Sequence, residues 1–213
     1  MKTKTIVIAN QKGGVGKSTT AIAMAAILEQ KGFKTLFIDT DPQCNSSGTY
    51  RAKVDGEATL FDVILESPPI PVAEAIQKTN NGDIVASDPL MRNADKILDS
   101  DVNGIFNLKD QLDELKKENK YDYIIIDTNP SLNKMLISSL IASDDLIIPV
   151  MADLYSIEGL MQFQVTLDAV KKRFNPDIRT TGLLLIKFNK RTRLGAKLKE
   201  QLEEIAKDLN TSS

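Results

Sequence analysis

Five short segments of this chain are almost continuously apolar, and the longer stretches between them place apolar residues at helical spacing. The apolar segments are rich in Ile, Leu and Val and hardly alternate with polar residues, which is typical of parallel strands covered on both faces. Leu108, Leu112 and Leu115 illustrate the spacing that predicts a helix with one buried side. Strands that alternate with helices predict an α/β fold with right-handed crossovers. The expected strands span residues 5–9, 34–39, 121–127, 145–150 and 181–186, and the expected helices span residues 18–30, 107–117, 131–143, 156–174 and 194–209.

The segment from residue 45 to residue 104 departs from this regular alternation. It contains several prolines and many polar residues, and only residues 83–86 resemble a further short strand. We therefore expect a single domain over residues 1–213, in which a mostly parallel, twisted sheet is flanked by helices. Residues 45–104 are expected to form an irregular excursion from that sheet.

The amino-acid composition excludes several classes of chemistry. The 213 residues include no histidine and one cysteine, Cys44, so an internal disulfide, a cysteine-based metal cluster and histidine acid–base catalysis are excluded. A net charge of −2 gives no sign of a nucleic-acid or membrane partner by bulk charge, so such a surface would be a local patch. There is no apolar run of about 18 residues and no secretory segment at the N-terminus, so a soluble, cytoplasmic protein is expected.

Residues 11–19, QKGGVGKST, connect the first predicted strand to the first predicted helix. A strand, a glycine-rich loop and a helix N-terminus are the components of a phosphate-binding loop, because glycines let backbone N–H groups converge on phosphate oxygens. In such a loop Lys17 reaches the β- and γ-phosphates, the Ser18 hydroxyl binds Mg²⁺, and Thr19 lies near the α-phosphate. The candidates for binding a nucleotide here are Lys12, Gly13, Gly14, Val15, Gly16, Lys17, Ser18 and Thr19.

Lys12 is the unusual residue of this loop. The common pattern G-x-x-x-x-G-K-[ST] has a glycine where this chain has Gln11, and it contains no second lysine. Two ammonium groups in one loop repel each other, so Lys12 fits best if it points toward a phosphate bound by another subunit. The stretch KGGVGKST resembles the deviant Walker A motif of the ParA/MinD ATPases, P-loop proteins in which two subunits enclose two ATP molecules. The resemblance implies that Lys12 crosses the dimer interface and acts in catalysis with Lys17.

Three aspartates follow predicted strands, at the edge where α/β sheets bind their ligands. Asp39 and Asp41 lie in the stretch DTDPQ, and Asp127 ends the run IIID. A strand-terminal aspartate such as Asp127 holds Mg²⁺ through water, and Asp39 or Asp41 could order a water or contact the hydrated metal. DTDPQ resembles the ParA pattern, which implies that Asp41 positions the attacking water and that Asp39 lies on the metal side. Turns and helix caps formed by these acids remain the alternative.

Two positions depart from the family pattern. Cys44 stands where ParA proteins usually have glycine, which affects the local turn, and Asn129 interrupts the usual DTPPS or DTAPS sequence. Both departures leave open a regulatory switch that binds nucleotide and hydrolyses it weakly.

A basic segment follows the last predicted strand, within residues 187–199. The resemblance implies that Asn189 contacts the adenine base and that the nearby cations bind DNA without sequence preference, by neutralising phosphates. A solvated, charged helix face is the alternative, because Glu200, Glu203 and Glu204 follow directly. The DNA-binding candidates are Lys190, Arg191, Arg193 and Lys197.

The resemblance covers almost the whole chain and implies an ATPase that partitions DNA in plasmid or chromosome segregation. Such a protein hydrolyses ATP to ADP and phosphate. It alternates between an ATP-bound dimer on the nucleoid and a monomer, works with a ParB-like centromere-binding protein, and does not use the membrane. The chain is expected to stop short of the usual family length at its C-terminus.

Other functions remain as alternatives. A MinD-like positioning ATPase would use the membrane, and the weakly hydrolysing switch would act by binding alone. Small-molecule ligases that share the loop fit the DPQ stretch and the basic segment poorly. Nitrogenase-type reductases are excluded, since their cluster needs cysteines that Cys44 alone does not provide.

Overall fold

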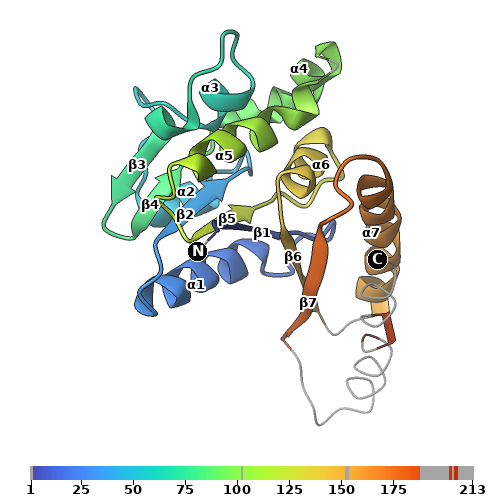
Figure 1. The fold of residues 1–213 in the computed structure, drawn as a ribbon. Helices are drawn as coiled ribbons and strands as arrows, with labels where there is room; N and C mark the ends of the chain where they lie inside the picture. The colour runs from blue at the N-terminus through green and yellow to red at the C-terminus, as the bar shows by residue number, and fades with distance from the viewer. Residues whose placement is uncertain (1, 102, 152–153, 188–201, 203, 206–213) are drawn as a thin grey trace.

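The core of the fold is a seven-stranded sheet with the order β3-β4-β2-β5-β1-β6-β7 (Figure 1). The computed structural model describes residues 2–101, 103–151, 154–187, 202 and 204–205. Neighbouring strands are parallel throughout, apart from β3, which runs antiparallel to β4. The strands are β1 Lys4–Ile8, β2 Thr35–Asp39, β3 Ile76–Thr79, β4 Gly82–Val85, β5 Tyr123–Asp127, β6 Asp145–Met151 and β7 Arg179–Ile186.

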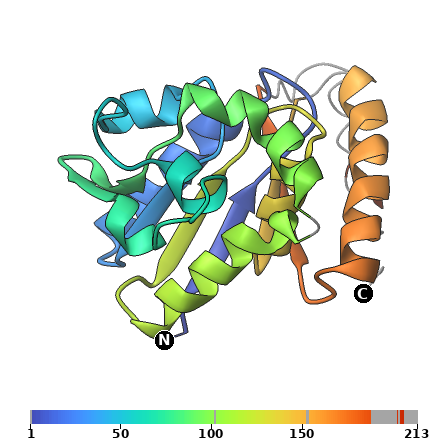
Figure 2. The ribbon, with the colours of Figure 1, turned by 90° about the horizontal axis from the view of Figure 1, so that it is seen from above.

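Helices cover both faces of the sheet. α1 lies against one face, whereas α4, α5 and α6 lie against the other, as Figures 1 and 2 show. Side chains of α7 join the core on this second face, beside β6 and β7. The helices are α1 Lys17–Gln30, α2 Asn45–Tyr50, α3 Leu60–Ile64, α4 Ala94–Ser100, α5 Asn107–Lys117, α6 Lys134–Ile141 and α7 Leu154–Arg173, with short 3₁₀ turns η1 Val72–Ala75, η2 Pro89–Asn93 and η3 Gly104–Phe106.

The core has two parts because successive strand residues point to opposite faces of the sheet. Under α1, Ile8, Phe37 and Ile125 pack against Ala21 and Ala25, whose small side chains let the helix lie close to the sheet. The opposite part is larger and includes Val7, Leu36, Ile126, Leu112, Leu140 and Phe163. Burial on both faces explains why the central strands are continuously apolar in sequence.

Most of the predicted elements are present. Each of the five predicted strands matches an observed strand, residues 83–86 correspond to β4, and the predicted helix over residues 107–117 has the same bounds as α5. The description of residues 45–104 as an excursion from the sheet is wrong for β3 and β4. β4 pairs with β2, so this segment extends the sheet. The predicted helix over residues 194–209 lies largely outside the described residues.

β7 is an outer strand of this sheet, and an apolar groove of about 440 Å³ separates it from α1. Among the described strands, β7 pairs with β6 alone. Leu184 of β7 and Ile27 of α1 line the groove, and their side chains are 43% and 52% exposed. Within the described part of the chain, this edge is thus less well covered than the centre of the sheet.

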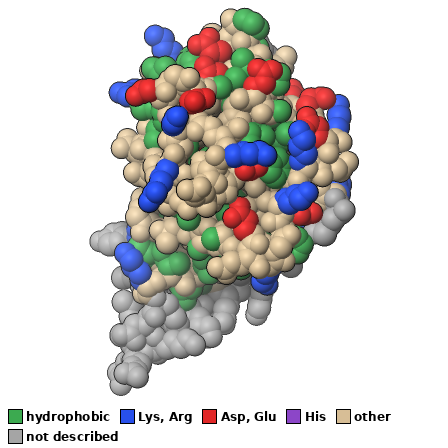
Figure 3. All heavy atoms as spheres, turned by 90° about the vertical axis from the view of Figure 1, so that its left-hand side faces the viewer, with side chains coloured by type: hydrophobic (Ala, Val, Ile, Leu, Met, Phe, Trp, Pro, Cys, Tyr) green, Lys and Arg blue, Asp and Glu red, His purple; other side chains and the backbone are tan. Residues whose placement is uncertain are grey.

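On the face shown in Figure 3, basic and acidic side chains are interspersed without a large area of one sign. The small net charge of the chain, −2, agrees with this mixed distribution of charges. In the part of the chain that the structure describes, no helix has both the length and the hydropathy needed to cross a membrane.

β1 occupies the position at which a ligand site is expected. It lies between β5 and β6. After β1 the chain passes to β2, on the β5 side of β1, and after β5 it passes to β6, on the opposite side of β1. Open α/β sheets bind ligands at such a reversal of strand order, beyond the carboxyl ends of the strands. The loop after β1 and the aspartates that end β2 and β5 meet at this edge.

Candidate functional site

The loop between β1 and α1 turns through two glycines in the left-handed region. Gly14 has a φ of 72° and Gly16 a φ of 73°, conformations that favour glycine. Gly13 and Gly14 are exposed, so the backbone of the loop faces solvent. Successive N–H groups in such a turn form a concave anion site, and the N-terminus of α1 at Lys17 adds its own N–H groups and dipole.

Asn10 fixes the start of the loop to the sheet. Its buried side chain donates from Nδ2 to the Pro149 carbonyl of β6 at 2.7 Å, and its Oδ1 accepts the Lys12 N–H at 3.0 Å. Gln11 makes a longer bond of 3.4 Å from Nε2 to Oγ1 of Thr166 on α7. The loop is therefore held by two neighbouring elements before any ligand binds.

Lys17 closes the loop from its other end. Its Nζ donates to the Lys12 carbonyl oxygen at 3.0 Å. Burial lowers the pKa of Lys17, whereas the negative charges of Asp127 and Asp41 raise it. The ammonium is thus bonded to the loop and within reach of the charges of two carboxylates, where terminal phosphates of a nucleotide would meet it.

Asp127 places a buried carboxylate at the site. It is fully buried at the end of β5, and its Oδ2 accepts a 2.7 Å hydrogen bond from the Ser46 hydroxyl. Its Oδ1 has no hydrogen-bond partner among the described residues. Burial raises the pKa of Asp127 to about 7, although the hydrogen bond from Ser46 and the nearby Ser18 hydroxyl lower it. A buried carboxylate oxygen without a partner is costly, so this oxygen is suited to a ligand.

The donor set at this point fits Mg²⁺. That ion prefers oxygen ligands and usually keeps several of its waters. The Ser18 hydroxyl, on the first turn of α1, lies close enough to Asp127 to lower the pKa of that carboxyl. Among the described residues, no group of three or more His, Cys, Asp or Glu side chains is placed to hold a metal. Phosphate oxygens and water would therefore complete a coordination shell begun by Ser18 and, through water, by Asp127.

Asp39 lies beside Asp127, because the two residues are register partners on β2 and β5. Its oxygens are used by the protein itself. Oδ1 accepts the Asp41 N–H at 3.0 Å, and Oδ2 accepts the N–H and the hydroxyl of Ser47 at 2.8 and 2.7 Å. Burial raises the pKa of Asp39, and these hydrogen bonds lower it. A metal-side role for Asp39 stays a prediction.

Asp41 is half-buried in the turn that follows β2. Its Oδ1 accepts the Gln43 N–H at 2.9 Å, and its carbonyl accepts the Cys44 N–H at 2.9 Å. The turn that the sequence offered as an alternative to a catalytic role of Asp41 is therefore present. It leaves the carboxylate close enough to Lys17 for their charges to interact, so positioning of water by Asp41 stays a prediction.

The remaining sequence candidates are less informative. Val15 is buried, whereas Thr19 is exposed on the first turn of α1. Asn129 is buried, and its Oδ1 accepts the Ser131 N–H at 3.2 Å in a local turn. The predicted adenine contact and DNA contacts lie outside the described residues, namely Asn189, Lys190, Arg191, Arg193 and Lys197.

Three polar residues belong to this site although no motif identified them. Asn10 anchors the loop, and Ser46 and Ser47 bind the two buried aspartates. Their position was the available signal, since Asn10 precedes the glycine loop and the serines follow the DPQ stretch. Sequence alone does not show which carboxylate each serine binds.

Known proteins resemble this chain over most of its length. It matches the family described as an AAA domain over residues 3–180. It is 37% identical to the chromosome partitioning protein ParA of Myxococcus xanthus, over 92% of this chain and 69% of that protein. It is 35% identical to the sporulation initiation inhibitor protein Soj of Bacillus subtilis, over 96% of this chain and 81% of that protein.

Solved structures of known proteins also resemble this chain over most of its length. A Mycobacterium smegmatis structure described as cobyrinic acid a,c-diamide synthase, with bound ATP analogue and magnesium, superposes with a TM-score of 0.87 at 27% identity, covering 95% of this chain and 82% of that one. A plasmid partition protein from Borrelia burgdorferi superposes with a TM-score of 0.77 at 34% identity, covering 95% and 86%. With this loop, these carboxylates and these relatives, the chain belongs to the ParA/Soj family of chromosome and plasmid partition ATPases.

Proposed function

We propose that this protein binds ATP with Mg²⁺, hydrolyses it to ADP and phosphate, and uses the cycle to partition DNA. One observation carries the nucleotide part of the proposal. The loop after β1 brings the buried Lys17 beside Asp127, whose Oδ1 has no partner among the described residues. A cation and an unsatisfied carboxylate oxygen at the end of a glycine loop suit a phosphate chain with its metal.

The residues of the chain supply positioning and electrostatic stabilisation. Backbone N–H groups of the loop and the Lys17 ammonium orient the phosphates, while Ser18 and Asp127 hold the metal. Mg²⁺ held there would supply positive charge to neutralise the charge that develops on the phosphate oxygens. Asp41 positions the attacking water from the turn after β2. Lys12 neutralises a phosphate bound by a second copy of the chain.

The DNA part of the proposal rests on the family and on the basic segment after β7. Relatives of this chain are named for chromosome partitioning and plasmid partition. Lys190, Arg191, Arg193 and Lys197 would neutralise phosphates without reading sequence, which makes affinity steeply dependent on salt. The ATP dimer would thus associate with the nucleoid, and a ParB-like centromere-binding protein would supply the cargo.

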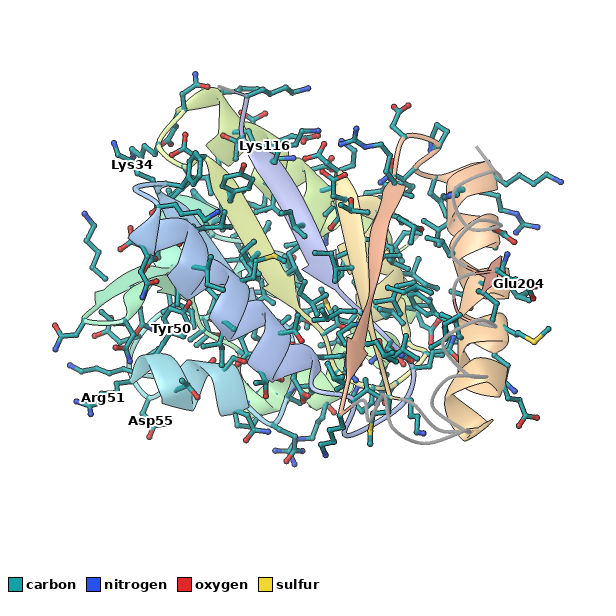
Figure 4. All side chains as sticks on the ribbon, turned by 90° about the horizontal axis from the view of Figure 1, so that it is seen from below. Lys34, Tyr50, Arg51, Asp55, Lys116 and Glu204 are labelled. Atoms are coloured by element: carbon teal, nitrogen blue, oxygen red, sulfur yellow. The ribbon has the colours of Figure 1, made fainter. Side chains whose placement is uncertain are left out.

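Light scattering tests this cycle. Mass is measured with ADP and with ATP–Mg²⁺, each with and without nonspecific duplex DNA at two salt concentrations. Lys12→Ala is the test variant. Lys34→Ala is the matched control, because Lys34 is an exposed lysine at the end of the sheet opposite to α2 (Figure 4).

The expected result is an ATP-dependent dimer for the wild type and for Lys34→Ala, and a monomer for Lys12→Ala. Only the dimer should bind DNA, and more weakly at high salt. A wild-type protein that stays monomeric with bound ATP would contradict the role of Lys12. A dimer that does not bind DNA at either salt concentration would contradict the partition function.

A further inference from the structure

Ser46 determines which oxygen of Asp127 is available to a ligand. Its hydroxyl donates to Oδ2 at 2.7 Å, and both residues are almost completely buried. The other oxygen, Oδ1, has no partner among the described residues. A serine that holds one carboxylate oxygen restricts rotation of the group, so the second oxygen keeps a fixed direction.

Ser47, the next residue of α2, binds the other buried aspartate. Its N–H and hydroxyl both donate to Asp39 Oδ2, and its hydroxyl oxygen accepts the N–H of Ser87, two residues after β4, at 2.9 Å. The opposite oxygen of Asp39 accepts the Asp41 N–H. Hydrogen bonds thus run from α2 through Asp39 to the backbone of Asp41.

α2 is short, and its position depends on these contacts. The helix spans Asn45–Tyr50 and begins after Cys44, which has a φ of 54° in the left-handed region. Its other end is fixed by Tyr50 (Figure 4), whose ring centroid lies 4.8 Å from that of Phe37 on β2. Six residues with a polar sequence do not form a stable helix alone, so tertiary contacts hold this one.

We propose that Ser46 and Ser47 are positioning residues that couple the metal side of the site, at Asp127, to the segment that carries Asp41. The inference rests on the proposed binding of Mg²⁺ and nucleotide. A shift of Asp127 toward a metal-bound water pulls on Ser46, and α2 transmits the shift through Ser47 and Asp39 to Asp41. The two serines act differently, since Ser46 orients Asp127 and Ser47 relays the position of α2.

The test uses Ser46→Ala, Ser47→Ala and a matched control. Thr49→Ala is that control, because Thr49 lies on the same helix, is exposed, and bonds the Asn45 carbonyl within α2. The first measurement is the Mg²⁺ dependence of binding of a fluorescent, non-hydrolysable ATP analogue, compared with binding in EDTA. The second is the alkylation rate of Cys44, the single cysteine of the chain, which precedes α2.

Ser46→Ala is expected to raise the Mg²⁺ concentration for half-maximal binding about tenfold, as loss of a residue that orients a metal-holding carboxylate does. Its binding in EDTA should match the wild type. Ser47→Ala should keep the wild-type Mg²⁺ requirement. In the wild type and in Thr49→Ala, adding Mg²⁺ to the analogue-bound protein should change the Cys44 alkylation rate. This response should be lost in Ser46→Ala and reduced in Ser47→Ala, because alanine at position 47 keeps the N–H bond to Asp39 but loses the hydroxyl bond.

Equal Mg²⁺ requirements for Ser46→Ala and Thr49→Ala would overturn the inference while leaving nucleotide binding intact. An equal alkylation response in Ser47→Ala and the wild type would overturn the relay. If Ser46→Ala does not fold, the Ser47→Ala measurements decide the relay by themselves. A wild-type protein that binds no analogue with Mg²⁺ would overturn the proposed function and this inference together, so the two failures are distinguishable.

Discussion

Gly16 joins the phosphate loop to α1 with a φ of 73°, and a Cβ built on it would lie 3.0 Å from Cδ1 of Ile186. Gly16→Ala is therefore expected to lower the free energy of unfolding by about 1–2 kcal/mol, because a side chain is strained in the left-handed region. Urea denaturation of the nucleotide-free protein measures this change.

Gly159→Ala is the matched control for that experiment. Gly159 lies inside α7, its φ is outside the left-handed range, and a Cβ there would meet nothing within 4 Å. Its replacement should raise the free energy of unfolding by about 0.4–1 kcal/mol, since alanine loses less entropy on folding. Equal effects at positions 16 and 159 would show that the loop does not keep its left-handed turn in solution.

The Cys44 thiol should react slowly at neutral pH. Burial first, and then the negative charge of Asp39, raise the pKa of Cys44 to about 11. Only the thiolate attacks an alkylating reagent, so the rate should increase about tenfold for each pH unit between about pH 8 and pH 10. Mass spectrometry of iodoacetamide-treated protein gives the rate. Glutathione serves as the control, and a Cys44 rate that levels off with that of glutathione would contradict the raised pKa.

At the scale of elements, α5 is held to the sheet by its buried leucines. Leu108, Leu112 and Leu115 face the core, and Leu112 is fully buried. Leu112→Ala should lower the free energy of unfolding by about 2–5 kcal/mol, since it removes apolar contacts and leaves a cavity. Chemical denaturation measures the change.

Glu114→Ala on the same helix is the control. Glu114 is exposed and its ion pair with Lys117 lies on the surface, so its loss should change stability by no more than about 0.5 kcal/mol. A Leu112→Ala protein as stable as Glu114→Ala would mean that α5 is not docked through this face.

The elements that sequence predicts best are those whose own residues carry the signal. β1, β5 and α5 show continuous apolar runs or a clear helical period, so their existence follows from burial. β3 and α2 were missed for a physical reason. β3, with the sequence IQKT, is a short edge strand that pairs only with β4 among the described strands, and the polar α2 is fixed by hydrogen bonds to distant aspartates.

The site was predictable as far as strand order allows. Lys17, Asp39 and Asp127 follow or end parallel strands, whose carboxyl ends share one edge of the sheet, so their proximity follows from the fold class. The roles of Ser46 and Ser47 were not predictable, because they depend on where α2 lies relative to β5. That placement comes from tertiary contacts of a segment without a periodic pattern.

At the scale of the whole molecule, Mg²⁺ with a non-hydrolysable ATP analogue should stabilise the folded chain. A ligand that binds only the folded state, at about 100 times its dissociation constant, adds about 2.7 kcal/mol to the free energy of unfolding. Thermal unfolding with and without ligand measures the shift in midpoint. Lys17→Ala should show little shift at the same ligand concentration, and a full shift in that variant would place the nucleotide elsewhere.

The outer position of β7 has a consequence for handling the protein. A strand that pairs on one side alone, as β7 does among the described strands, presents N–H and C=O groups on its other side. Leu184 adds apolar surface there, beside the groove along α1. Concentrated stocks should therefore become turbid through sheet-edge association, a colloidal property that is separate from nucleotide chemistry. Leu184→Lys should delay turbidity during storage, because a charge at a strand edge opposes pairing. Equal turbidity of the variant and the wild type would show that the molecules associate through another surface.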